Sequence, residues 1–158
     1  MMGIITFGEK KEGIDYIWRP AVYCLMFNSQ KEKIAIIQTS DDEFFLPGGG
    51  MEKNESHEEC LKREALEEMG MDINIGHFIG CAQRYFYSTN DNKYYLSEGY
   101  FYLCDKGRQI GKPFEVDHFL KWIEPMQAID CLFHEHQSWA VNEALKLTTA
   151  IKHEHKNP

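Results

Sequence analysis

Residues 44–71 read FFLPGGGMEKNESHEECLKREALEEMGM, and this stretch decides how the rest of the chain is interpreted. Residues 49–71 follow the spacing G-x5-E-x7-R-E-apolar-x-E-E-x-G-apolar. The fixed positions are Gly49, Glu55, Arg63, Glu64, Glu67, Glu68 and Gly70. Since each residue type makes up about 5–7% of an average protein, seven such identities coincide by chance on the order of once in 10^8 windows. The pattern therefore indicates a functional loop and helix.

The local signals place a helix inside this stretch. Ser56 and Glu59 have the spacing of a capping box, in which the serine accepts from a free N–H group and the glutamate bonds back. The helix is expected to end near Met69, because Gly70 favours the left-handed conformation that stops helices. Gly48–Gly50 is expected to open the loop before it.

The helix is predicted to separate charge from apolar surface. At about 100° per residue, Glu68 lies about 40° and Glu67 about 60° from Glu64 around the helix axis. The apolar side chains fall on another side, at Leu61, Ala65, Leu66 and Met69. We therefore expect the helix to pack through this apolar side and to show the three carboxylates on the other.

Three neighbouring carboxylates repel one another and raise one another's pKa values. A divalent cation would relieve this repulsion, and oxygen-only ligands suit Mg²⁺ or Mn²⁺. Arg63 precedes Glu67 by four residues, so it could orient that carboxylate. A bare acidic helix face is usually just solvated, but the complete pattern favours a metal site.

This pattern resembles the signature of the Nudix hydrolases, with every fixed position filled. The resemblance implies an α+β fold in which a mixed β-sheet is sandwiched between α-helices. It also implies a pyrophosphohydrolase that uses Mg²⁺, with Mn²⁺ as the other candidate, on a nucleoside diphosphate linked to another group. Attack of water at phosphorus would give a nucleoside monophosphate and pyrophosphate or another phosphorylated product.

The resemblance also implies roles for individual residues. Glu64, Glu67 and Glu68 correspond to metal ligands, with Glu64 as the general base in some members, and the Gly48 carbonyl corresponds to a further ligand. The implied bracing residues are Gly49, Glu55 and Arg63.

Residues outside the pattern are weaker candidates. Many family members add an acid from a later loop, and Glu115 is preferred over Asp117 for that catalytic role, against the alternative of a solvated loop acid. Glu98 lies within an apolar strand, where pairing with a lysine or arginine is favoured over a metal role. The histidines of His134-Glu135-His136 are expected at the surface because they lack a third ligand at zinc-like spacing.

The predicted substrate-binding residues are Arg84, Tyr87 and Arg19. An arginine among aromatic residues could bind phosphate while a ring stacks on a base, although sheet packing explains the same pattern. Tyr87 lies 16 residues past Met71, one short of a tyrosine typical of diadenosine polyphosphate hydrolases. The proline typical of ADP-ribose hydrolases is absent from this region.

The chain is most similar to the MutT type, which acts on nucleoside triphosphates, including oxidised ones. Three alternatives stay open: a diadenosine polyphosphate hydrolase, a non-catalytic nucleotide or RNA sensor, and an allylic diphosphate isomerase. The isomerase would depend on a catalytic cysteine, for which Cys24 is the candidate. The sensors and isomerases usually depart from the complete pattern.

The whole chain fits one domain. Its 158 residues are 43% hydrophobic and carry a net charge of −8, which disfavours stable binding to nucleic acid or anionic membranes. Five scattered cysteines indicate reduced, mostly buried thiols and a cytoplasmic protein, and no apolar run approaches a membrane span. We expect a domain over residues 1–150, a frayed tail over 151–158 and a small-molecule nucleotide as partner. A homodimer is compatible with the sequence, because Tyr94, Tyr95, Tyr100 and Tyr102 could line an interface, although the same tyrosines could equally form sheet core.

Further elements follow from periodicity and turn signals. The first pair of strands, residues 16–27 and 34–38, is expected to form a hairpin. Two long strands, residues 73–87 and 93–104, are expected to be joined by the turn over residues 88–92. Other strands are expected at 44–46 and 119–123, with helices from Pro125 and over residues 136–147.

Overall fold

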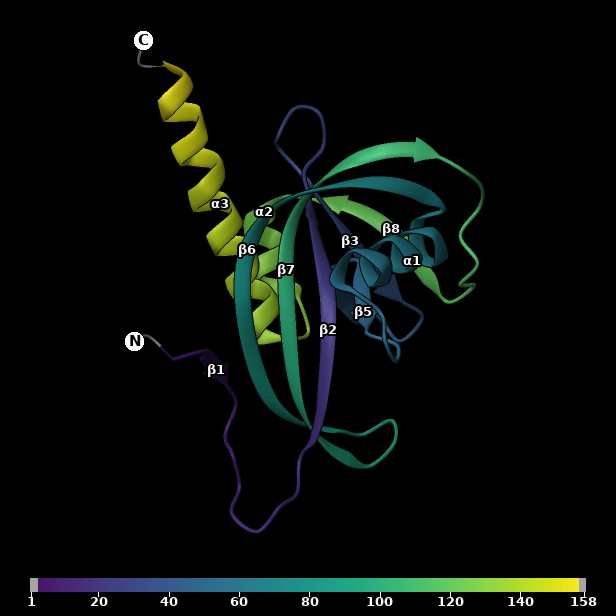
Figure 1. The fold of residues 1–158 in the computed structure, drawn as a ribbon, viewed down its shortest axis with the longest axis vertical. Helices are drawn as coiled ribbons and strands as arrows, with labels where there is room; N and C mark the ends of the chain where they lie inside the picture. Colours follow the sequence, from purple (N-terminus) through teal and green to yellow (C-terminus); the bar gives the residue numbers. More distant parts are fainter. Residues whose placement is uncertain (1–2, 157–158) are drawn as a thin grey trace.

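The computed structural model describes residues 3–156, with side chains described through residue 149. The helices are α1 (His57–Met69), α2 (Pro125–Cys131) and α3 (Glu135–Lys156). The strands are β1 (Ile5–Phe7), β2 (Ile17–Met26), β3 (Ile34–Thr39), β4 (Phe44–Phe45), β5 (Gly48–Gly50), β6 (Met71–Ser88), β7 (Lys93–Gln109) and β8 (His118–Ile123). Two sheets lie between α1 on one side and α2 and α3 on the other (Figure 1), which confirms the predicted α+β arrangement.

The larger sheet is mixed and has the strand order β1-β6-β7-β2-β5. Strand β1 runs parallel to β6 and β2 runs parallel to β7, whereas the other pairs are antiparallel. The smaller sheet has the order β4-β3-β8 and is antiparallel. The predicted long hairpin is confirmed, because β6 and β7 pair from Ser88 and Lys93 outward.

The predicted hairpin between β2 and β3 is wrong. These strands lie in different sheets, and the backbone pairing between them is an isolated bridge from Phe27, the residue after β2, to Ile34. The side chain of Asn28 accepts from the backbone of Glu32 and Lys33, so the turn itself is tight. Both edges of β2 pair elsewhere, with β7 on one side and β5 on the other. The glycines expected to open a loop thus form strand β5 instead.

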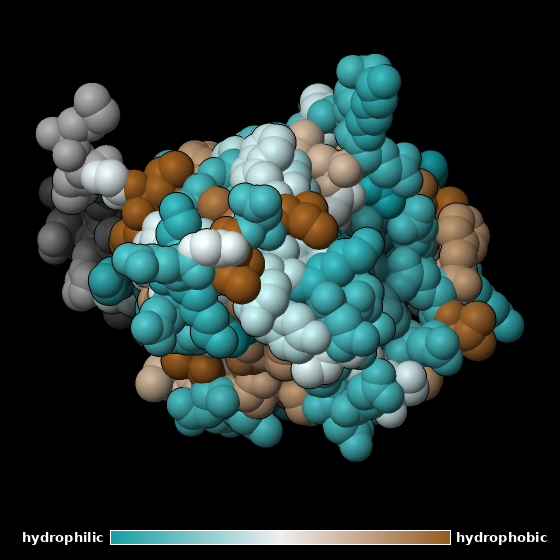
Figure 2. Space-filling model, turned by 90° about the horizontal axis from the view of Figure 1, so that it is seen from below, coloured by the Kyte–Doolittle hydropathy of each residue, from teal (hydrophilic) through white to brown (hydrophobic). Residues whose placement is uncertain are grey.

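Both faces of the sheets are buried. Alternate side chains of β2 and β3 point to opposite faces, so Val22 and Ala35 join a core with α1, whereas Leu25 and Ile36 join a core with α2 and α3. Seen from the end that carries the β6–β7 turn, the surface is mainly hydrophilic with small separate apolar areas (Figure 2). Among residues 3–156, no helix has the length and apolar character needed to cross a bilayer.

The predicted ends of α1 are confirmed. Ser56 accepts from the backbone N–H of Glu59, the Glu59 side chain accepts in return, and Gly70 has φ +66°. Helix α3 continues to Lys156, beyond the expected end near residue 147, so residues 151–156 of the expected tail are helical. The hydroxyls of Thr148 and Thr149 bond to carbonyls one turn earlier, and Pro158, the next helix breaker, lies outside the described residues.

Candidate active site

Two carboxylates of the pattern are buried against the sheets. Glu64 is 9% exposed and Glu68 is 4% exposed, four residues apart on one face of α1. The expectation that all three carboxylates face away from the packed side is therefore wrong for these two. The reason is tertiary, because strand β5 and the segment leading into β8 cover this part of the helix. Glu67 is only half-buried.

Glu68 lies between two neighbouring segments. Its Oε1 accepts from the backbone N–H of Gly48 at 2.8 Å, and its Oε2 lies 3.3 Å from Nδ1 of His118. Burial raises the pKa of Glu68, while these two hydrogen bonds oppose that effect. Among the side chains described, no lysine or arginine pairs with it. A buried carboxylate without a cationic partner is costly unless another positive group approaches.

Glu64 is the second buried carboxylate. Burial, followed by the charge of Glu68, raises its pKa to about 7. Nη1 of Arg63 lies 3.0 Å from Oε1 of Glu64 and partly opposes this shift. The Glu64 side chain also lies directly against Gly49, where a Cβ atom would come within 2.7 Å of Oε1. Glycine at residue 49 thus lets strand β5 approach the helix.

Arg63 joins the loop to the helix. Its Nε and Nη2 donate to the two oxygens of Glu55 at 2.7 and 3.0 Å, which lowers the pKa of Glu55 to about 2. Nη2 also donates to the Gly50 carbonyl at 3.0 Å, and Nη1 lies 3.3 Å from Glu67. These contacts agree with the implied bracing roles of Glu55 and Arg63.

The loop between β7 and β8 brings Glu115 to the helix. The backbone N–H groups of Phe114 and Glu115 donate to the Glu67 carbonyl at 2.9 and 3.2 Å, which satisfies a carbonyl in the last turn of α1. Two groups of ligand atoms result, each lying within 4.8 Å: Glu64, Glu67 and Glu115 in one, and Glu68, Glu115 and His118 in the other. Glu115 belongs to both groups, whereas Asp117 belongs to neither.

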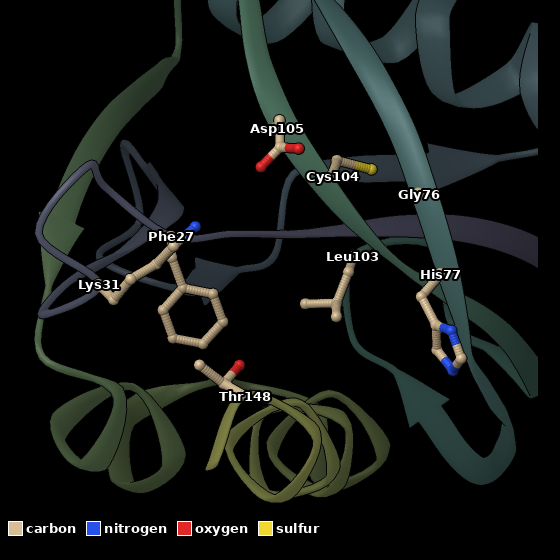
Figure 3. Close-up of a pocket in the computed structure, with 8 residues that line it drawn as sticks. All are labelled: Phe27, Lys31, Gly76, His77, Leu103, Cys104, Asp105 and Thr148. Carbon is tan, nitrogen blue, oxygen red and sulfur yellow. The ribbon is translucent and has the colours of Figure 1, made fainter. Parts of the chain in front are cut away.

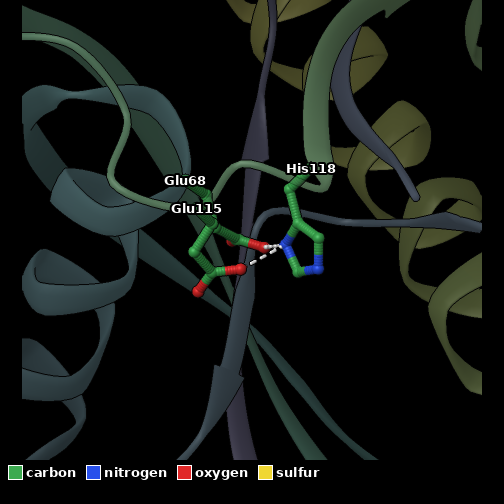
Figure 4. Close-up of side chains that lie close together, drawn as sticks. All are labelled: Glu68, Glu115 and His118. Atoms are coloured by element: carbon green, nitrogen blue, oxygen red, sulfur yellow. Dashed lines mark hydrogen bonds and ion pairs between the residues drawn. The ribbon is translucent and has the colours of Figure 1, made fainter. Parts of the chain in front are cut away.

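His118 is the residue of this cluster that the sequence analysis missed. Its Nδ1 lies 2.5 Å from Oε2 of Glu115 and also faces Glu68 (Figure 4). The available signal was a histidine three residues after the candidate loop acid, directly before the strand predicted at residues 119–123. The buried carboxylate oxygens fit a hard divalent cation such as Mg²⁺ or Mn²⁺, because few positive side chains compensate them.

The three predicted substrate-binding residues lie in different places. Arg19 is exposed on β2, beside β5, with its Nε 3.5 Å from the position of a Cβ on Gly50. Arg84 faces the segment between α2 and α3, where its Nη1 donates to the Phe133 carbonyl at 2.9 Å. Both arginines pair in register with Ser97 of β7, so they lie along one row across the sheet.

Tyr87 lies apart from both arginines. It is exposed near the β6–β7 turn, and its hydroxyl donates to Asn92 at 3.0 Å. Because successive residues of a strand alternate, Tyr87 and Arg84 point to opposite faces of β6. The structure therefore does not bring Tyr87 to the carboxylate cluster.

Two expectations about single polar residues are wrong. Glu98 pairs with no lysine or arginine among the described side chains, and instead accepts from Trp18 at 3.3 Å, Gln83 at 2.7 Å and the Tyr100 hydroxyl. His134 and His136 are buried rather than at the surface, because α3 packs them against aromatic side chains. Burial lowers their pKa values to about 2 and about 4, so both are neutral at pH 7.

Cys24 is completely buried within β2. The neighbouring Cys104 thiol and burial raise the pKa of the Cys24 thiol well above its ordinary value. A reactive thiol needs the opposite environment, exposed and electropositive. The five cysteines are free, and Cys24, Cys60 and Cys104 are buried as expected, whereas Cys81 and Cys131 are half-buried.

A separate cavity of about 310 Å³ opens between the sheet and α3. Its walls include Phe27, Leu103 and Thr148, and it holds no residue of the 49–71 pattern (Figure 3). The clustered carboxylates on α1, rather than this cavity, are therefore the candidate active site.

The fold places this acidic cluster on a loop–helix motif beside the sheets. Residues 17–145 match the NUDIX domain family, and the chain belongs to this family.

Two curated relatives match a shorter segment. The chain is 38% identical over 68 residues to the low-salt glycan biosynthesis protein Agl8 of Haloferax volcanii, covering 40% of this chain and 43% of that protein. It is 33% identical over 64 residues to mouse diphosphoinositol polyphosphate phosphohydrolase 3-alpha, covering 39% of each. The matches thus span less than half the length of these relatives.

Solved structures resemble the fold over most of the chain. The Escherichia coli ORF135 protein has a TM-score of 0.65 at 19% identity, covering 85% of this chain and 94% of that one. A Caenorhabditis elegans Ap4A hydrolase has a TM-score of 0.63 at 13% identity, covering 85% and 98%. At these identities the similarity establishes the fold alone.

Proposed function

We propose that this protein is a divalent-cation-dependent pyrophosphohydrolase that cleaves a nucleoside diphosphate linked to another group. Our preferred substrate is a nucleoside triphosphate, including oxidised nucleotides, which water would split into a nucleoside monophosphate and pyrophosphate. The observation that carries this proposal is the two clusters of ligand atoms at α1, both of which include Glu115. The backbone of Gly48 lies beside them, bonded to Glu68.

The residues present would divide the work among them. Glu64, Glu67, Glu68, Glu115 and the Gly48 carbonyl would hold Mg²⁺, or Mn²⁺ in its place. When bound, the cation neutralises diphosphate oxygens and lowers the pKa of water. A carboxylate accepts the water proton, and a group with a pKa near the working pH does so best. Glu64 is our candidate for that step, as an alternative to a ligand role, because its carboxylate lies within 4.8 Å of the ligand atoms of Glu67 and Glu115.

The bracing contacts support positioning of these groups. Arg63 fixes Glu64 and Glu67 relative to Glu55 and the Gly50 carbonyl, so the helix and loop would keep one geometry during turnover. Arg19 lies beside β5, near enough to this strand to bind a phosphate of the substrate. Arg84 is proposed to contact the substrate further along the same row of the sheet. A substrate contact by Tyr87 stays a prediction, because this residue lies away from the carboxylate cluster.

The names of similar proteins support the type of reaction more strongly than they support one particular substrate. The mouse relative is named a phosphohydrolase of diphosphoinositol polyphosphates, and solved neighbours are named as an ADP-ribose pyrophosphatase, a UDP-X diphosphatase and an Ap4A hydrolase. These names share a linked phosphate chain and differ in the attached groups. They favour phosphoanhydride cleavage over any other reaction class.

The test is a hydrolysis panel with product identification. Nucleoside triphosphates, oxidised guanine triphosphate, nucleotide sugars, ADP-ribose and diadenosine polyphosphates are each incubated with protein and Mg²⁺, then again with EDTA. Cleavage of nucleoside triphosphates to monophosphate and pyrophosphate, lost in EDTA, is the expected result. Preferred cleavage of diadenosine polyphosphates would identify these compounds, rather than nucleoside triphosphates, as the substrate. Tight nucleotide binding without cleavage would favour the sensor alternative.

A variant then tests the substrate role of Arg19. Arg19→Ala is expected to raise KM about tenfold through loss of a charged phosphate contact, with a smaller effect on kcat. Tyr87→Phe removes only a hydroxyl bonded to Asn92 and serves as the comparison. Equal KM values for Arg19→Ala and the unmodified protein would remove Arg19 from the substrate site.

A further inference from the structure

We propose that His118 supplies a nitrogen ligand to the divalent cation, alongside Glu68 and Glu115, and that the site therefore favours Mn²⁺ over Mg²⁺. The inference rests on the proposed function, because it concerns the same cation. It adds a residue outside the 49–71 pattern and a preference that carboxylates alone would not produce.

The backbone of β8 fixes the direction of the His118 side chain. His118 is the first residue of β8 and pairs in register with Thr39 of β3, and the preceding carbonyl of Asp117 accepts from Ser40 at 3.1 Å. Alternate residues of a strand point to the same face, and Leu120 and Trp122 of this strand pack against the core beneath α1. The imidazole therefore points toward α1.

The ring nitrogen lies close to an oxygen of each of two carboxylates. Nδ1 of His118 lies 3.3 Å from Oε2 of Glu68 and 2.5 Å from Oε2 of Glu115, and Figure 4 shows the three side chains converging. Adjacent ligands of an octahedral cation, each about 2.1 Å from it, lie about 3 Å apart. A cation among these three atoms would thus need only small shifts of the side chains.

The other contacts of the cluster leave these atoms available. Oε1 of Glu68 already accepts from Gly48, so its Oε2 is the oxygen that faces the site. The backbone of Glu115 is held at the Glu67 carbonyl, which keeps its side chain beside the ring. Without a cation, a proton on Nδ1 is shared with the carboxylates; on binding, that proton leaves to solvent and the nitrogen lone pair faces the cation.

A nitrogen ligand changes which cation is preferred. Carboxylate, carbonyl and water oxygens suit Mg²⁺, whereas imidazole suits transition metals. Mn²⁺ accepts both kinds of ligand, so a site with Glu68, Glu115 and His118 should hold Mn²⁺ more tightly than Mg²⁺. A histidine that only donated a hydrogen bond to Glu68 would leave the ratio of the two affinities nearly unchanged.

The test combines spectroscopy with calorimetry on the full chain. Pulsed electron paramagnetic resonance of bound Mn²⁺ should detect coupling to a ¹⁴N nucleus. His118→Gln should abolish this coupling because it removes the ring nitrogen, while the glutamine amide can still donate a hydrogen bond to the carboxylates. Calorimetric titration of His118→Gln should give about tenfold weaker Mn²⁺ binding and less than about threefold change for Mg²⁺. Thermal melting verifies that the variant folds.

His57→Gln is the matched control. His57 lies on α1, the helix that carries Glu68, is half-buried and bonds through Nδ1 to the Tyr102 hydroxyl at 2.8 Å, and it belongs to neither of the two ligand groups. This variant should keep the nitrogen coupling and both affinities. Mn²⁺ binding without nitrogen coupling, or coupling that survives in His118→Gln, would overturn this inference and leave the proposed function standing. Failure of the unmodified protein to bind either cation would overturn both.

Discussion

A Cβ atom on Gly49 would lie 2.7 Å from Oε1 of Glu64, so strand β5 and helix α1 touch at these two residues. Real Cβ atoms do not approach oxygen this closely, and the adjacent Gly48 and Gly50 are themselves joined to α1 through Glu68 and Arg63. The distance between strand and helix therefore depends on the missing side chain at residue 49. This contact leads to the first prediction.

Gly49→Ala should displace the Glu64 carboxylate. We expect turnover to fall about 10- to 100-fold, since a shift of about 1 Å in a catalytic group can cost that much. The free energy of unfolding should fall by about 1–3 kcal/mol, as in other overpacked sites. Gly50→Ala is the control for stability, because its Cβ would meet Arg19 at an ordinary contact distance of 3.5 Å. Equal stability of the two alanine variants would contradict the proposed contact.

Glu67→Gln and Glu68→Gln each remove a proposed ligand charge while keeping the side chain's size. Turnover with Mg²⁺ should fall by at least about 100-fold, because even residues behind the ligands cost about 10- to 100-fold. Circular dichroism should be unchanged. Glu58→Gln provides the comparison, since Glu58 is exposed and forms an ion pair with Lys62. Retention of most of the Mg²⁺-dependent rate in both ligand variants would remove them from the active site.

Glu115→Gln tests the residue shared by the two carboxylate groups. Because its backbone, not its side chain, holds the loop at Glu67, the loop should stay in place. We expect at least about a tenfold loss of turnover and weaker binding of Mg²⁺, measured by calorimetry. Asp117→Asn changes a nearby acid outside both groups and should behave like the unmodified protein. An unchanged rate in Glu115→Gln would show that Glu115 is a solvated loop acid with no part in turnover.

The pKa of Glu64 predicts how stability depends on pH in the metal-free protein. Folding raises that pKa from 4.5 to about 7, so between these values the folded chain holds a proton that the unfolded chain has released. The free energy of unfolding should therefore fall as pH rises from about 4.5 to 7, by on the order of 2 kcal/mol from this residue. Glu68, whose pKa is also raised, adds a change of the same sign.

Urea unfolding in EDTA at pH 5 and pH 7.5 measures this effect. Glu64→Gln should reduce the loss of stability between the two pH values, because glutamine does not titrate. Glu58→Gln should keep the loss seen in the unmodified protein. The assignment would be wrong if Glu64→Gln and the unmodified protein lost stability equally.

Arg63→Lys tests the bracing of the loop. Lysine has one ammonium group and cannot reproduce the paired bonds to Glu55 together with the bond to the Gly50 carbonyl. We expect about 1–3 kcal/mol lower stability, measured by urea unfolding near pH 7. The pKa of Glu55 is lowered to about 2, so the pair contributes above about pH 4.5 and is lost as pH falls toward 2. If Arg63→Lys is as stable as the unmodified protein, the loop does not depend on the hydrogen bonds of Arg63 to Glu55 and to the Gly50 carbonyl.

Local interactions explain what could be predicted. The capping box at Ser56, the stop at Gly70 and the turn between β6 and β7 each depend on residues within a few positions of one another. The spacing of the glutamates on α1 is set by helical geometry, so their convergence could be inferred as well. The sequence of β2, β3 and the turn between them also predicts a local hairpin. This prediction is wrong because both edges of β2 pair with strands that are distant in the sequence.

The sequence by itself determined the family, the loop–helix motif and the clustering of the carboxylates on α1, because motif spacing and helix periodicity are properties of a short segment. Only the tertiary structure decided that Glu64 and Glu68 are buried, that His134 and His136 lie in the core, and that His118 reaches the cluster. Glu68 and His118 are 50 positions apart, and no local pattern links them. Their contact exists because β8 pairs with β3 and the loop before it binds the last turn of α1.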